Sequence, residues 1–193
     1  MKKFLLLFIS SILFISGCSG LSASVPANPY EVKAGSKVLS LYDDAKETFE
    51  ENRFEIYEST EDPFYITYDV DYTDWNNYIL YRNREDINKI GCIYLFDNSI
   101  LTYKSISVGD DLNKLKKTFD KLYIQEDDDC ETSDVYGYLR FCAAFFNSKG
   151  EEVSSLNELD ENEKGTYIIY LTDENDIIVN ILLRDMKSAK ACL

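Results

Sequence analysis

Three things are scarce in this sequence: histidine, positive charge and long apolar runs. The 193 residues contain no histidine, so the usual general base of hydrolytic enzymes and most zinc constellations are excluded. The apolar run at the N-terminus covers only residues 4–15, whereas about 20 apolar residues are needed to cross a bilayer. A permanent transmembrane helix is therefore disfavoured at this position.

The shortage of positive charge restricts the partners of the chain. Lysine and arginine total 20 against 35 acidic residues, which gives a formal net charge of −15. Such a surface repels nucleic acid and offers no basic patch to anionic lipid headgroups. We therefore expect no nucleic-acid partner, and the charge favours solubility or a basic partner. The hydrophobic fraction of 45% is that of a globular domain.

The N-terminal stretch has the order of a secretion signal. Two lysines precede the apolar run, and Ile15-Ser16-Gly17-Cys18 closes it with small residues before a thiol. This tetrapeptide resembles the bacterial lipobox, in which the cysteine sulfur receives a diacylglyceryl group. The resemblance implies cleavage between Gly17 and Cys18 and lipidation of Cys18. The alternative is an ordinary signal peptide that is cut near Ser22-Ala23-Ser24.

Lipidation would decide where the rest of the chain is located. Two acyl chains hold a protein stably at a bilayer, whereas one holds it only weakly. Residues 1–17 are then the signal peptide, and residues 18–34 are the lipidated cysteine and a proline-containing tether. We expect a lipid-anchored protein at the extracytoplasmic face of the cell membrane, with the acyl chains as its membrane contact.

Four further cysteines remain for the exported part of the chain. They are Cys92, Cys130, Cys142 and Cys192. An even number outside the cytoplasm permits disulfides, and four cysteines allow three connectivities. A local disulfide between Cys130 and Cys142 is plausible, because an acidic loop and the following strand carry them. The alternative is a buried thiol at Cys92 and at Cys142, since both lie in apolar strand patterns.

Two stretches have the apolar spacing of short amphipathic helices. The first follows Gly35, with Ser36 as a possible N-cap. The second follows Gly109, with Asp110 or Asp111 as the cap. We expect each helix to have three to four turns.

Strand patterns rich in aromatic and β-branched residues follow each helix. They cover residues 53–59, 63–71, 77–83, 90–96 and 100–107 in the first half, and 135–147, 166–172 and 177–184 in the second. Lys46–Phe49 of the first helix aligns with Lys116–Phe119 of the second. The pattern predicts two tandem units, 35–107 and 108–185, and a tail at 186–193. The expected fold is α+β, with helices packed on one face of antiparallel sheet.

The duplicated pattern supports one family resemblance. A Gly-Ser or Gly-Asp pair before a short helix and an antiparallel meander is similar to the tandem units of β-lactamase inhibitor proteins. Outer-membrane assembly lipoproteins of the SmpA/OmlA type carry a single similar unit. The resemblance covers residues 35–185 and implies a fold rather than a function.

Carboxylates are the remaining candidates for chemistry. Glycosidases use two of them about 5 to 10 Å apart, but with 35 acidic residues any chosen pair is uninformative. Residues 160–165 match an EF-hand loop at its first, third and sixth positions. Lys164 occupies a ligand position, however, and Leu171 stands where a bidentate glutamate is needed. We therefore expect no enzymatic activity, no metal site of this type and no cofactor.

Two acidic clusters leave a calcium interpretation open. One contains Asp69, Asp71 and Asp74, and the other covers residues 126–129. Clustered oxygens bind calcium weakly outside cells, and the alternative is a solvated acidic loop.

Aromatic residues provide the other candidate site. Strand alternation places Phe141 and Phe145 on one face, expected to be core, and Tyr138, Arg140 and Cys142 on the other. The candidate binding surface consists of Tyr65, Trp75, Tyr138 and Arg140. Tyr, Trp and Arg dominate interface energetics, although tyrosine is also an ordinary half-buried strand residue.

These observations favour a noncatalytic lipoprotein that binds another envelope or extracellular protein. The alternative is a receptor domain for a small ligand or for calcium.

Overall fold

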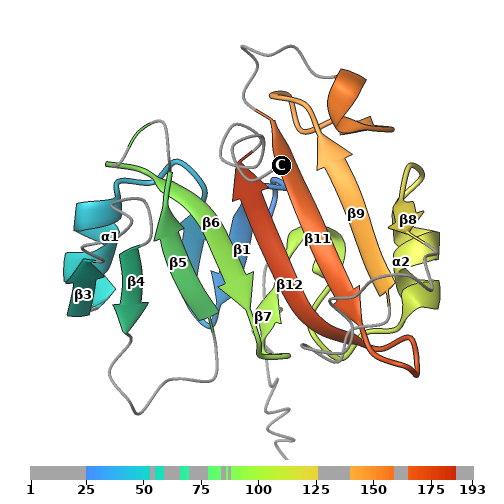
Figure 1. Ribbon diagram of the computed structural model, residues 1–193, viewed down its shortest axis with the longest axis horizontal. Coiled ribbons are helices and arrows are strands. Elements are labelled where there is room, and N and C mark those ends of the chain that lie inside the picture. Colours follow the sequence, from blue (N-terminus) through green and yellow to red (C-terminus); the bar gives the residue numbers. More distant parts are fainter. Residues whose placement is uncertain are drawn as a thin grey trace, which may run out of the picture.

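The computed structural model describes residues 25–52, 55–58, 66–69, 78–83, 86, 88–125, 140–158 and 165–185. A seven-stranded antiparallel sheet forms the centre of this part of the molecule (Figure 1). Its strand order is β10–β9–β11–β12–β6–β5, and β8 also pairs with β9. The strands are β5 (Tyr78–Arg82), β6 (Ile90–Leu95), β8 (Tyr123–Gln125), β9 (Arg140–Phe146), β10 (Glu152–Val153), β11 (Thr166–Thr172) and β12 (Ile178–Asp185). The two halves of the chain meet where β12 pairs with β6.

Smaller elements surround this sheet. A three-stranded sheet has the order β2–β1–β7, and β3 pairs with β4. These strands are β1 (Glu31–Ala34), β2 (Lys37–Ser40), β3 (Glu55–Glu58), β4 (Ile66–Asp69) and β7 (Ile100–Leu101). The helices are α1 (Ala45–Asn52), α2 (Leu112–Thr118) and two 3-10 turns, η1 (Tyr103–Ser105) and η2 (Leu156–Glu158). None of the described helices has the length and apolar character needed to cross a membrane.

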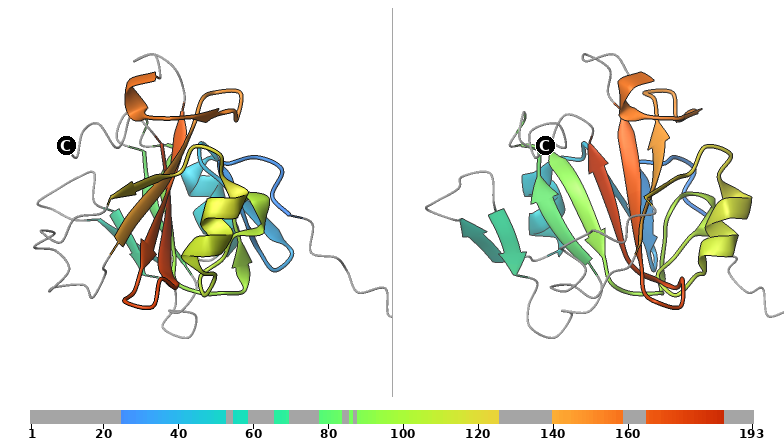
Figure 2. Two further views of the ribbon diagram at one scale, coloured as in Figure 1. Left: turned by 90° about the vertical axis from the view of Figure 1, so that its right-hand side faces the viewer. Right: turned by 45° about the vertical axis from the view of Figure 1, so that its right-hand side comes forward.

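The main core lies between the large sheet and the elements on one of its sides. Figure 2 shows the β2–β1–β7 sheet and α2 on the same side of the large sheet. Val32 and Leu39 enter this core from the small sheet, and Leu112 and Leu115 enter it from α2. Each such side chain contributes about 1.5 to 3 kcal/mol when it leaves water. This face of the sheet is therefore occupied by the packing that holds the fold together.

The α+β class expected from the sequence is wrong, because the fold is mainly β. The α-helices among the described residues have only eight and seven residues. The β2–β1–β7 sheet and α2 both pack against the core face of the large sheet, so this face is not covered by a layer of helices. The two halves of the chain also build one sheet together.

The helix expected after Gly35 begins later than the apolar spacing indicates. Residues 37–40 form strand β2, and α1 starts only at Ala45. Tyr42 lies between them with a φ of 76°, a left-handed conformation that no continuous right-handed helix contains. Val38 and Leu39 therefore belong to a strand. The N-cap is Asp44 rather than Ser36, since Asp44 Oδ1 accepts the Glu47 N–H at 3.0 Å.

The loops before the two helices have the same hydrogen bonds. We call residues 40–44 and 107–111 the Asp–Asp loops. Asp43 Oδ2 accepts the Ser40 N–H at 3.0 Å, and Asp110 Oδ2 accepts the Ser107 N–H at 2.8 Å. Asp111 accepts the Lys114 N–H at 2.8 Å and caps α2, so it is the correct one of the two caps that the sequence offers, Asp110 and Asp111.

Both Asp–Asp loops are attached to the large sheet in the same way. The Tyr42 N–H donates to the Ile90 carbonyl at the start of β6, at 2.9 Å. The Gly109 N–H donates to the Ile178 carbonyl at the start of β12, at 2.8 Å. Because Asp44 corresponds to Asp111, residues 46–49 do not align with residues 116–119, as the sequence comparison had them.

The two strands that follow are also bulged at corresponding places. Gly91 is the extra residue of β6 opposite β5, because Tyr81 pairs with Cys92 and Arg82 with Ile90. Val179 is the extra residue of β12 opposite β11, where the same shift of register occurs. A bulge increases the local twist of a strand. The two strands that join the halves, β6 and β12, thus have a bulge at the corresponding position.

A buried polar network joins the first half of the chain to the end of β12. The carboxylate of Asp185, which is 1% exposed, accepts the Tyr42 hydroxyl at 2.6 Å and the Asn83 amide at 2.9 Å. Burial, followed by the hydrogen bond to Asp185, raises the pKa of Tyr42 well above its ordinary value near 10. The network ties together groups that lie more than 100 residues apart in the sequence.

Candidate functional site

The large sheet has a second face, opposite the main core, with its own apolar cluster. Alternation along β9 and β11 sends Ala143, Phe145, Tyr167 and Ile169 to this face. The Phe145 and Tyr167 rings are stacked, with centroids 6.2 Å apart. We call this side of the sheet the second face. It is distinct from the core face, where the alternate residues of the same strands are packed.

The alternation predicted for β9 is confirmed, and so is the burial of Phe145, but the expected exposure of the face that carries Cys142 is wrong, because that face is buried as well. Cys142, Ala144 and Phe146 lie in the main core, whereas Phe141 and Phe145 lie on the second face. Arg140 is paired with Thr172 and shares the core side with Cys142. Alternation defines two faces, and only the covering elements decide which of them is the main core.

A half-buried apolar stripe crosses four strands of the second face. It consists of Phe141 on β9, Leu171 on β11, Leu182 on β12, Tyr94 on β6, and Phe96 just after β6. Leu171 is paired with Phe141, and Leu182 is paired with Tyr94. The Tyr94 and Phe96 rings are 4.2 Å apart between centroids. Leu171 lies opposite the buried Asn180 on β12 and diagonal to Leu182, so the two pairs adjoin at this position. The five side chains of the stripe retain part of their exposure.

One cationic group lies on the second face beside the apolar cluster. Arg184 of β12 is paired with Tyr167 on one side and with Cys92 on the other. Its guanidinium donates to the Tyr167 hydroxyl at 3.3 Å. Burial alone would lower the pKa of Arg184, but the Tyr167 hydroxyl and the Cys92 thiol raise it above its ordinary value. Arg184 therefore stays charged.

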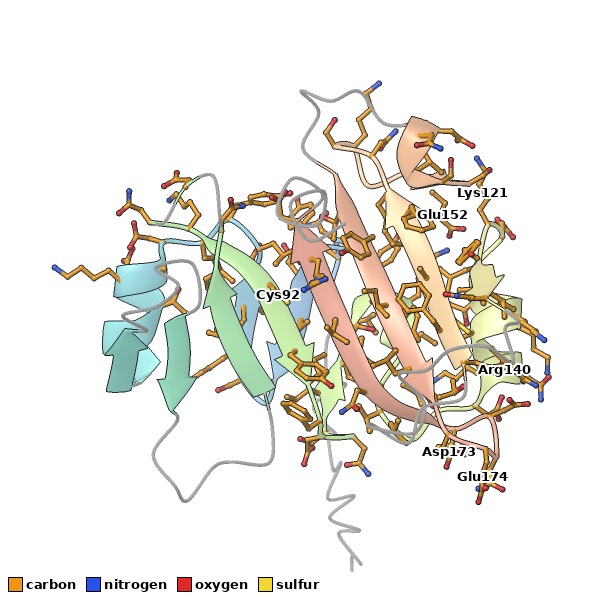
Figure 3. The ribbon with its side chains drawn as sticks, viewed as in Figure 1. Cys92, Lys121, Arg140, Glu152, Asp173 and Glu174 are labelled. Atoms are coloured by element: carbon orange, nitrogen blue, oxygen red, sulfur yellow. The ribbon has the colours of Figure 1, made fainter. Side chains whose placement is uncertain are left out.

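An acidic rim borders one end of the sheet, where the apolar stripe ends. It consists of Asp97 after β6 and of Asp173 and Glu174 in the turn between β11 and β12. These segments lie at the same end because β6 and β12 are antiparallel and adjacent. Figure 3 labels Asp173 and Glu174 at this end of the sheet. The acidic rim therefore lies next to Leu171 and Phe96 along the chain.

Backbone and side-chain donors keep two rim carboxylates ionised. The Ser99 side chain and the Ser99 N–H, which is 2.6 Å from Asp97 Oδ1, lower the pKa of Asp97. The N–H groups of Ile177 and Asn175, each 2.9 Å from Asp173 Oδ1, lower the pKa of Asp173. Hydrogen bonds to a carboxylate favour its charged form.

Arg140 lies at the margin of the core side rather than on the second face. It forms an ion pair with Asp176 in the turn between β11 and β12, and both side chains are about two-fifths exposed. Exposed pairs of this kind contribute about 0 to 1 kcal/mol. Of the four aromatic and basic residues that the sequence indicated, Arg140 is the one that the structure describes. Tyr65, Trp75 and Tyr138 lie outside the described residues.

The described cysteines have different surroundings. Cys142 is fully buried in the main core, and burial raises the pKa of its thiol to about 11. Cys92 is also buried, with 8% of its surface exposed. The predicted burial of both thiols is confirmed. Cys130 lies outside the described residues, so the disulfide with Cys142 stays a prediction, and the same is true of Gly17 and Cys18.

Sequence reasoning missed the residues that define the second face. Leu182 and Arg184 lie in a strand that the pattern predicted, but their partners Tyr94, Tyr167 and Cys92 come from other strands. Pairing between β6 and β12 leaves no local signal in the sequence. Within the described residues, the structure contains no cluster of three or more metal-ligating side chains.

Comparisons with known proteins place the chain in no described family. No family model matches it, and neither the curated proteins nor the solved structures contain a match.

Proposed function

We propose that this protein is a noncatalytic lipoprotein of the cell envelope that binds another protein through the second face of its large sheet. The apolar stripe is the observation that carries the proposal. Its five apolar residues come from four strands, remain half-buried, and lie on the side of the sheet opposite the main core. Partly exposed apolar surface with aromatic anchors is typical of protein interfaces.

The rigidity of the sheet supports this use of the stripe. β12 and β11 are paired over seven residue pairs, and β11 and β9 over another seven. Side chains on such strands need little further ordering when a partner docks, which reduces the entropic cost of binding. The stripe is thus held in one arrangement before contact.

The lipid anchor belongs to the same proposal. The motif Ile15-Ser16-Gly17-Cys18 supports lipidation of Cys18, and the acidic chain makes the acyl groups its means of membrane attachment. Mass spectrometry of the N-terminal peptide from native material should show a diacylglyceryl group on Cys18. An unmodified thiol at this position, or an intact leader, would remove the anchor from the proposal.

Site-specific crosslinking in cells tests the binding function. A photoreactive phenylalanine analogue at Phe96 lies on the apolar stripe, and one at Val38 lies on the exposed side of β2, where the side chain is 54% exposed. We expect a discrete crosslinked protein from position 96 that is absent from position 38. Equal crosslinking at both positions, or none at Phe96, would contradict the proposal.

A further inference from the structure

The charges around the apolar stripe are asymmetric. The acidic rim of Asp97, Asp173 and Glu174 borders the end where Leu171 and Phe96 lie. Arg140 lies at the same end, but its charge is paired with Asp176 on the core side of the sheet. The cationic Arg184 is removed from this end by several residues of β12. A partner segment that covers the stripe and extends past the end of the sheet therefore meets carboxylates.

The carboxylates of the rim are arranged to remain charged. Asp97 and Asp173 both accept backbone N–H groups, which lowers their pKa values. Glu174 is exposed to solvent. At neutral pH the rim thus presents three negative charges beside apolar surface.

We propose that the partner docks a cationic segment here, with apolar side chains on the stripe and lysine or arginine side chains at the acidic rim. This inference rests on the proposed function and specifies the chemistry of its partner. Opposite charges across an interface increase the association rate and select among partners.

The charge of the whole chain makes other occupants less suitable. A second copy of this protein carries the same formal net charge of −15 and would bring like charges together. An anionic lipid surface is repelled for the same reason. A cationic protein segment is the occupant that complements both the stripe and its rim.

Two synthetic peptides test the inference on residues 19–193, which retain every core residue from Val32 to Leu183. The peptides share their apolar residues, and one carries lysines where the other carries glutamates. Fluorescence anisotropy gives the dissociation constants at low and at physiological ionic strength. We expect the lysine peptide to bind at least about tenfold more tightly, with a smaller difference at the higher salt concentration.

Matched variants locate the binding. The double variant Asp173→Asn with Glu174→Gln keeps the hydrogen-bond acceptors of the turn but removes two charges. It should increase the dissociation constant of the lysine peptide by about three- to tenfold. Glu47→Gln with Glu151→Gln changes the net charge equally at exposed positions elsewhere, and should leave binding unchanged. Phe96→Ser should weaken it by about tenfold, and Leu171→Ser provides a second test of the stripe if Phe96→Ser unfolds.

The outcomes separate this inference from the proposed function. Equal binding of the two peptides, or equal weakening by the two charge-matched double variants, would overturn the cationic partner. A crosslinked partner at Phe96 would still support the binding function in that case. Self-association of residues 19–193 through the stripe in light scattering would instead identify a second copy as the occupant and overturn the inference.

Discussion

The two Asp–Asp loops have the same hydrogen bonds but different residues at their left-handed position. Tyr42 has a φ of 76° in the first loop, and Gly109 has a φ of 91° in the second. Glycine adopts this conformation freely, whereas another residue pays about 1 kcal/mol. The Tyr42 hydroxyl bonds to Asp185, so its side chain contributes a tertiary link that glycine cannot supply. In the first half, the backbone strain at Tyr42 is thus accompanied by a hydrogen bond to the end of β12.

The bulges of β6 and β12 also differ between the two halves, but here the glycine lies in the first half. Gly91 occupies the bulge of the first half, and Val179 occupies that of the second. A Cβ atom on Gly91 would lie 2.5 Å from the Asn83 Cα atom, inside any real contact distance. The backbone of Asn83 lies close to β6, because its N–H donates to the Lys89 carbonyl at 2.7 Å, just before the strand begins. Glycine is required here by a neighbour rather than by its own backbone angles.

The largest loss of stability is expected when the bulge residue of one strand is replaced by that of the other. Gly91→Val forces the new side chain into the Asn83 backbone and should cost more than about 4 kcal/mol of unfolding free energy. The reverse change, Val179→Gly, should cost about 1 kcal/mol because it mainly adds backbone entropy. Urea denaturation measures both. Similar losses for the two variants would show that the bulges are equivalent in packing as well as in register.

The next effect concerns the buried network of the first half. Asp185→Ala removes the acceptor of the Tyr42 hydroxyl and the Asn83 amide, and should cost about 3 kcal/mol. Asp120→Ala removes an exposed carboxylate and should change stability by less than about 0.5 kcal/mol. Equal midpoints and slopes for both variants in urea would mean that the network does not join the halves.

A smaller effect is expected from strain in the second loop. Gly109→Ala places a Cβ atom in open space, since its nearest neighbour is the Asn98 Cβ atom at 3.9 Å. The cost should therefore be the left-handed backbone alone, about 1.5 kcal/mol. A combined calorimetric and urea measurement that finds no loss would indicate that the loop changes conformation at this position.

The smallest effect is a difference in alkaline stability. Folding raises the pKa of Tyr42, so the protonated hydroxyl contributes stability that is complete below pH 10 and declines as pH rises above it. Tyr42→Phe should lower the free energy of unfolding at pH 7. Between about pH 9.5 and about 10.5, however, this free energy should fall less in the variant than in the wild type, with a difference of under about 1 kcal/mol. Burial also raises the pKa of Tyr170, so the stability of the variant still declines in part at alkaline pH. Parallel curves for wild type and variant would exclude Tyr42 as a source.

Local patterns in the sequence identified several elements well. The pattern predicted for residues 166–172 is strand β11. The prediction for 90–96 differs from β6 by one residue at its C-terminal end, and the prediction for 177–184 differs from β12 by one residue at each end. Most of the segment 100–107 is not a strand, because β7 ends at Leu101 and η1 follows. Lys104 has a φ of 57°, which interrupts the extended chain at this point.

The candidate site was harder to predict than the strands. Arg140 was chosen as an exposed strand residue, but it lies on the core side and pairs with Asp176. Arg184, which lies beside the apolar cluster of the second face, had no sequence signal because its neighbours Tyr167 and Cys92 come from β11 and β6. Sequence alternation assigns a residue to one of two faces and leaves the identity of each face open.

The amino-acid sequence alone determined the acidic charge, the absence of imidazole chemistry, a cap of α2 at Asp110 or Asp111, and the alternation within β9 and β11. These properties depend on composition or on residues close together in the chain. Tertiary structure decided that β6 pairs with β12, that Tyr42 reaches Asp185, and that the apolar stripe lies opposite the core. Contacts between distant segments depend on how all the elements share a limited core, and no local pattern records that competition.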